Sequence, residues 1–122
     1  MTYSFTIPHK LDGLNKLIYL NRSNKYLAAK HKKFVQGDII YCIGNIPPIE
    51  KPVEIHFLWV EPDKRRDLDN IYSAKKYILD ALVTAGVLKN DTQRYVVRLE
   101  DYILIDKNNK SGQVDVRIIE VD

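Results

Sequence analysis

The sequence has few of the residues that build disulfides or sulfur-rich metal sites. Cys42 is the only cysteine among 122 residues, which excludes an intramolecular disulfide and a cysteine-rich zinc site. The three histidines, His9, His31 and His56, lack the spacing of metal ligands. Any metal is therefore expected to be bound by oxygen atoms.

Long apolar runs are also absent. No segment approaches the roughly 18 apolar residues of a membrane span. The first residues, MTYSFTIPHKLDG, lack the uninterrupted apolar stretch of a secretory signal, so we expect a cytoplasmic protein. A length of 122 residues with 45% hydrophobic and 29% charged residues predicts one folded domain, residues 1–122.

The positive charge is concentrated near the start of the chain. The net charge is only +3, but residues 1–41 carry seven Lys or Arg against two acids, and residues 99–122 carry three against six. Within the basic part, four lysines lie close to Tyr26 and His31: Lys25, Lys30, Lys32 and Lys33. This segment is either a solvated helix face or a surface that contacts a phosphate backbone.

Periodicity predicts an α+β chain. Strands are expected at Tyr3–Ile7 and Val53–Val60, the latter with Val53, Ile55, Phe57 and Trp59 on one core-facing side. Helices are expected at Leu14–Leu20, at Asn24 to about Cys42, and at about Leu68–Ala85. Asn24 is the predicted cap of the second helix, Leu27, Ala28, Phe34 and Val35 are its predicted core contacts, and Gly37 could interrupt it. Two final strands, Tyr95–Ile105 and Gln113–Val121, are expected to form a hairpin.

An acidic motif follows the second strand and the basic run Lys64–Arg66. Asp67 and Asp69 stand at i and i+2, where two carboxylates can converge on one hard cation such as Mg²⁺. The alternative is that one of these acids caps the following helix.

The helix after this motif carries polar residues along one side. Ile71, Ala74, Ile78, Leu82 and Ala85 form its apolar stripe, with Lys75 near the stripe's edge. Asp69, Lys76 and Asp80 share the polar face, so Lys76 is the better active-site cation, although it could simply pair with Asp80. Gly86 should end the helix, and Asn90 with Asp91 should form a turn.

Together these elements resemble the RusA family of Holliday-junction resolvases. The likeness lies in R-R-D-L-D-N, a lysine-bearing helix ending in D-A-L, then A-G-V and a turn with aspartate before Thr-Gln, and it is densest over residues 65–93. The resemblance implies a small, homodimeric, Mg²⁺-dependent endonuclease, of a kind often encoded by prophages. With the periodicity, it gives an expected fold of one α+β domain with a mixed sheet of about four strands.

The resemblance also assigns roles by position. It implies that Asp67, Asp69 and Asp91 bind the metal and that Lys76, four residues before the aspartate of D-A-L, is the catalytic lysine. About three extra residues separate Asn70 from Asp80, so counting forward from Asn70 gives Ser73 instead. The family's turn often has two adjacent acids, whereas this chain has asparagine before its aspartate.

The implied activity is hydrolysis of DNA phosphodiesters at four-way junctions, in recombination and repair. The metal would activate a water molecule, Lys76 would stabilise developing charge, and a basic surface would hold the backbone. The expected DNA-binding residues are Arg65, Arg66, Lys25, Lys30, Lys32 and Lys33. The alternatives are a nuclease for other branched DNA or RNA, and a non-catalytic junction-binding protein.

Overall fold

A computed structural model describes the backbone of residues 1–122 and the side chains at all positions except 14, 15 and 17. Strands and helices follow one another in the order predicted from the sequence, apart from one divided helix. The elements are β1 (Thr2–Ile7), α1 (Leu14–Ser23), α2 (Lys25–Ile43), β2 (Val53–Glu61), α3 (Leu68–Ser73), α4 (Lys75–Thr84), β3 (Val96–Ile105) and β4 (Gln113–Glu120).

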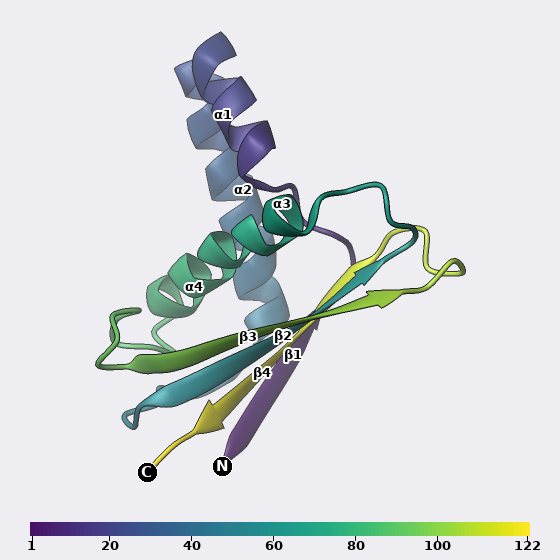
Figure 1. Ribbon diagram of the computed structural model, residues 1–122. Helices are drawn as coiled ribbons and strands as arrows, with labels where there is room; N and C mark the ends of the chain where they lie inside the picture. Colours follow the sequence, from purple (N-terminus) through teal and green to yellow (C-terminus); the bar gives the residue numbers. More distant parts are fainter.

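The four strands form one mixed sheet, ordered β1-β4-β2-β3 (Figure 1). β4 is antiparallel to both β1 and β2, whereas β3 is parallel to β2. The predicted α+β fold with a four-stranded mixed sheet is therefore confirmed. The predicted hairpin of the last two strands is wrong, because β2 lies between them. β2 has buried residues along its whole length, which suits the interior of the sheet.

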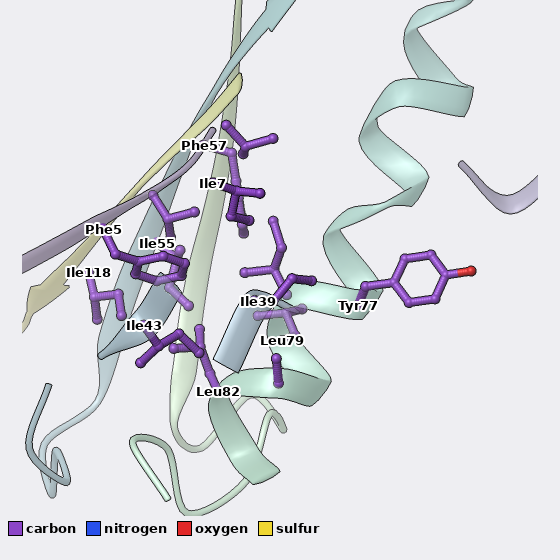
Figure 2. Packing of buried hydrophobic residues seen from close by; sticks show 14 of the residues in the cluster. Phe5, Ile7, Ile39, Ile43, Ile55, Phe57, Tyr77, Leu79, Leu82 and Ile118 are labelled. Carbon is purple, nitrogen blue, oxygen red and sulfur yellow. The ribbon is translucent and has the colours of Figure 1, made fainter. Parts of the chain in front are cut away.

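The helices lie on one face of the sheet, and the core fills the space between (Figures 1 and 2). Ile55, Phe57 and Trp59 of β2 are almost fully buried, as the alternation predicted. Ile39 of α2 and Leu82 of α4 close the core from the helical side. The chain between β2 and β3 thus returns over the sheet through α3 and α4, which fixes where the acidic motif lies.

The single helix predicted over Leu68–Ala85 is divided at Ala74. The Ser73 hydroxyl donates to the Asn70 carbonyl over 2.6 Å, and the Ala74 N–H turns to the carbonyls of Ile71 and Tyr72. Such side-chain bonding to the backbone competes with the regular helical ladder. The later helix ends at Thr84, so Ala85, which was predicted to be buried, is exposed.

The first two helices form a helical hairpin. Asn24 caps α2, since its side-chain oxygen accepts from the N–H groups of Tyr26 and Leu27 at 2.9 and 3.3 Å. α2 continues through Gly37 without interruption. Ala28 and Val35 are buried as predicted, but Leu27 and Phe34 are 48% and 75% exposed, because this part of the hairpin projects from the rest of the molecule (Figure 1).

Among the residues that the structure describes, none of the helices combines the length and apolar character needed to cross a bilayer.

Candidate active site

The acidic motif sits where the chain enters α3. Asp67 occupies the N-cap position with extended backbone angles, φ −68° and ψ 143°, but its side chain makes no capping hydrogen bond. Asp69 lies in the first turn, and its Oδ1 accepts from the Asn70 N–H over 3.0 Å. Both side chains are exposed. The capping role considered for Asp67 is therefore not observed, and both carboxylates face solvent.

Lys76 joins the helix after this motif to the turn that holds Asp91. Its Nζ lies 2.9 Å from Asp80 Oδ1 and 3.2 Å from Asp91 Oδ2. Hydrogen bonds to Asp80 and then Asp91 are the main causes that raise the pKa of Lys76. The turn itself is held by Asn90, whose Oδ1 accepts from the Asp91 N–H over 2.7 Å. Lys76 is thus a protonated cation placed between two carboxylates.

Lys75 points to the sheet instead. Its Nζ bonds Asp101 Oδ2 on β3 and lies 5.8 Å from the ring centroids of Phe57 and Tyr72. The Trp59 indole N–H donates to the other oxygen of the same carboxylate over 2.9 Å. The two neighbouring lysines therefore have different surroundings, and Lys76 is the one on the side of Asp91.

Residues 12–119 match the family model described as Endodeoxyribonuclease RusA. The chain belongs to this family. No curated protein matches it. The matched range includes the acidic motif, Lys76 and Asp91, so membership in the RusA family places a nuclease activity on this chain, in a family that resolves Holliday junctions.

In this member of the RusA family, Arg66 anchors the acidic loop to β2 and to the segment after β1. One guanidinium nitrogen lies 3.3 Å from Glu61 Oε2, and the other donates to the Leu11 carbonyl over 2.8 Å. Burial is the main cause that raises the pKa of Glu61, and the nearby positive charge of Arg66 opposes it. Arg66 is thus mostly occupied within the protein, whereas Arg65 is exposed and lies 3.6 Å from Asp63 Oδ2. Of the two arginines predicted to bind DNA, Arg65 is the more available.

Gly13 connects the first helix to the same loop. A Cβ atom at this position would come within 2.2 Å of the Asn70 backbone oxygen and side-chain Oδ1. Only glycine allows this approach. The start of α1 is thereby fixed beside the residue that follows Asp69.

The four lysines that are predicted to bind DNA lie on α2. Lys25, Lys30, Lys32 and Lys33 are all exposed. They are separate from Asp67 and Asp69 in the chain, but α1, the partner of α2 in the hairpin, packs against α3. The basic surface and the acidic loop therefore belong to neighbouring parts of the molecule.

The three carboxylates are of the right kind for Mg²⁺, because this ion takes hard oxygen ligands, often one or two carboxylates with water and phosphate. The three carboxylates are farther apart than the ligands of a complete metal site. Among the described side chains, no three His, Cys, Asp or Glu residues gather closely enough to bind a metal ion. The structure brings Lys76 to Asp91, but it does not unite Asp67, Asp69 and Asp91 in one cluster.

Two contacts escaped the sequence analysis. Asp101 lies on the core-facing side of β3, in register with Phe57, and an acid at such a position signals a buried partner. The pairing of Arg66 with Glu61 left a weaker signal, because Glu61 is simply the last residue of an apolar strand. The first contact joins residues that are 26 positions apart in the chain, and the second involves a loop residue, so periodicity does not reveal them.

Proposed function

We propose that this protein resolves four-way DNA junctions by Mg²⁺-dependent hydrolysis of phosphodiester bonds. The observation that carries this proposal is the contact between Lys76 and Asp91, at 3.2 Å. It joins the helix that follows Asp67 and Asp69 to the turn that the family resemblance marks as the third acidic position. The family match supports the nuclease class, and the exposed acids support a site that is open to a large substrate.

Asp67, Asp69 and Asp91 would hold the metal. A bound Mg²⁺ supplies charge neutralisation on the phosphate and lowers the pKa of a coordinated water molecule. Because Mg²⁺ commonly completes its coordination with water and substrate phosphate, the two neighbouring carboxylates of the acidic loop form a reasonable starting pair.

Lys76 provides the fixed positive charge of the site. Its raised pKa keeps it protonated at neutral pH, so its role is electrostatic: it stabilises negative charge that develops on the phosphate or on the leaving oxygen. Asp80 and Asp91 hold the ammonium group in place before substrate binds. Arg65 and the lysines of α2 hold the DNA backbone through contacts that weaken as salt rises.

We also propose that the protein acts as a homodimer and that β3 forms the contact. β3 is a ten-residue strand at the sheet edge, so one row of its backbone groups faces away from β2. Large apolar side chains on both of its faces are exposed, including Val97, Leu99, Ile103 and Leu104. A long apolar edge invites pairing with another strand. A second copy related by a two-fold axis would cover it and supply the second active site that two symmetric strands need.

Sedimentation velocity tests this interface. Val97→Lys should convert the dimer into a monomer, because it places a charge in the strand contact. Thr2→Lys is the matched control on the opposite edge strand, β1, and should remain dimeric. A wild-type protein that sediments as a monomer at assay concentrations would remove the dimer from the proposal.

The activity is tested with a mobile four-way junction and a linear duplex of the same sequence, each with Mg²⁺ and with excess chelator. We expect paired, symmetric nicks in the junction and none in the duplex, and chelator should abolish them. Equal cutting of both substrates would mean a general nuclease. Junction binding without cleavage would instead favour a non-catalytic binding protein.

A further inference from the structure

The net positive charge of the chain comes from the projecting part of the helical hairpin. We name residues 14–34, which comprise α1 and the first half of α2, the arm. The arm holds six Lys or Arg and no acid, so it carries a charge of +6 in a protein whose net charge is +3. All the remaining residues together are therefore net negative. A polyanion such as DNA is attracted to the arm rather than to the rest of the surface.

Aromatic side chains are exposed on the same arm. Tyr26 is 74% exposed and Phe34 is 75% exposed, although phenylalanine is among the residues most often buried. At about 100° per residue, Tyr26, Lys30, Lys33 and Phe34 fall within an arc of roughly 100° on α2. The arm thus presents rings and ammonium groups side by side on one face.

A shallow groove of about 440 Å³ lies between the two helices of the arm. Leu20, Leu27 and Phe34 supply its apolar surface, and Lys16 and Lys30 supply positive charge along it. Apolar surface with lysines beside it suits a flat aromatic group attached to a phosphate chain. A base that has left the stack has this chemistry.

A nucleic acid fits this surface better than another protein. Lysine is depleted from the cores of protein interfaces, whereas lysine mixed with exposed aromatic residues is typical of proteins that bind single strands. A symmetric contact between two arms would also bring two groups of six positive charges together.

The arm begins beside the acidic loop. Gly13 precedes α1 and lies against Asn70, and α1 packs on α3 (Figure 1). DNA whose reacting phosphate lies at the acidic loop therefore has the arm next to it. The base pairs at the branch point of a four-way junction can lose a stacking neighbour, unlike those of an uninterrupted duplex.

We propose that the groove of the arm binds an unstacked base of the DNA substrate, with Phe34 stacking on the base and Lys16 and Lys30 holding the adjacent phosphates. This inference rests on the proposed function for the choice of DNA as substrate. It adds a recognition site separate from the acidic loop, for unpaired rather than duplex nucleotides.

The test measures binding in excess chelator, so that it does not depend on cleavage. The probes are a fluorescent single-stranded oligonucleotide, a duplex of equal length, and a four-way junction with 2-aminopurine at the branch point. Phe34→Ala should weaken single-strand binding by about 5- to 150-fold, the range for loss of one stacked base, and leave duplex binding almost unchanged. It should also reduce the change in 2-aminopurine fluorescence on binding to the junction.

Two further variants separate stacking from charge. Tyr41→Ala removes an aromatic ring that is 86% exposed on α2 outside the arm, and it should bind every probe like wild type. Lys30→Met should reduce the slope of log affinity against log salt by about 0.7 for the single strand, whereas Phe34→Ala should leave the slope unchanged.

Several results would overturn the proposal. Phe34→Ala binding that equals wild type on the single strand would exclude stacking in the groove. An equal loss on duplex and single strand would assign the arm to the backbone alone. A change of oligomeric state in Phe34→Ala without a loss of single-strand affinity would make the groove a protein contact. A failure to cut junctions in Mg²⁺, with these binding differences intact, would instead refute the proposed junction cleavage and leave the binding site of the arm in place.

Discussion

Lys75 and Lys76 are adjacent in sequence, but the structure predicts opposite consequences for replacing them with methionine. The Lys75 side chain is 22% exposed and its partner Asp101 is 17% exposed. Fully buried pairs cost about 3–5 kcal/mol when one partner is removed, and exposed pairs contribute about 0–1 kcal/mol, so Lys75→Met should cost about 2 kcal/mol. For a domain of 122 residues, this lowers Tm by about 8 °C.

Lys76 should show the reverse pattern. Its side chain is 68% exposed, so Lys76→Met should change the free energy of unfolding by less than about 0.5 kcal/mol. Loss of its charge beside Asp91 should lower the rate of junction cleavage by about 10²- to 10³-fold, the usual cost of removing one preorganised electrostatic group.

The assay is a pair of measurements on each variant: thermal unfolding by circular dichroism, and cleavage at a temperature well below both transitions. We expect Lys75→Met to be destabilised and to cut junctions within a few-fold of wild type, and Lys76→Met to be stable and inactive. A stable, inactive Lys75→Met beside an active Lys76→Met would refute the assignment of the two side chains.

Three further changes test other parts of the structure. The pKa of His9 is raised, mainly by its hydrogen bond to the Lys10 carbonyl and further by the Asp38 carboxylate. Protonated His9 therefore stabilises the folded protein below about pH 6.5, and this stabilisation is lost as the pH rises through the raised pKa. In urea unfolding, the free energy of unfolding of wild type should fall between pH 6 and pH 8 by up to about 1 kcal/mol more than that of Asp38→Asn. Equal losses in the two proteins would contradict this. Gly13→Ala should cost about 1–3 kcal/mol in the same assay, because its Cβ would overlap the Asn70 oxygens. Gly37 lies within α2, and a Cβ atom added there would meet no other atom within 4 Å, so Gly37→Ala should instead stabilise the protein by about 0.5–1 kcal/mol. A loss as large as that of Gly13→Ala would refute the steric explanation.

Local patterns foretold much of the fold. The alternation around Phe57 identified β2 and its buried side, and the Asn24 cap located the start of α2. Gly86 ends α4 with φ +79°, where the N–H groups of Val87 and Gly86 bond the carbonyls of Leu82 and Val83. These features depend on contacts within a few residues, which a sequence displays directly.

Other features depend on tertiary placement. The break at Ala74 coincides with a hydrogen bond from the Ser73 hydroxyl to the Asn70 carbonyl, which the apolar period does not reveal. Leu27 and Phe34 have the spacing of core residues, but the hairpin projects beyond the core that would cover them. Sheet order likewise escaped the analysis, because neighbouring strands in sequence resemble a hairpin whether or not another strand inserts between them.

The sequence predicted which residues form the candidate site better than it predicted how they are arranged. The motif pointed to Asp67, Asp69, Asp91 and Lys76, and the structure joins the last two. Asp101, which distinguishes Lys75 from Lys76, lies 26 residues from Lys75 in the chain. A contact at that separation depends on where α4 lies relative to the sheet, so it could be recognised only once the fold was known.

The most direct test of the central claim compares binding and cleavage of a four-way junction by wild type and Asp69→Asn, with Glu50→Gln as a control that removes an exposed acid elsewhere. We predict that Asp69→Asn binds the junction as tightly as wild type and does not cut it in Mg²⁺, whereas Glu50→Gln binds and cuts normally. Cleavage by Asp69→Asn at the wild-type rate would contradict a metal-dependent active site at the acidic loop.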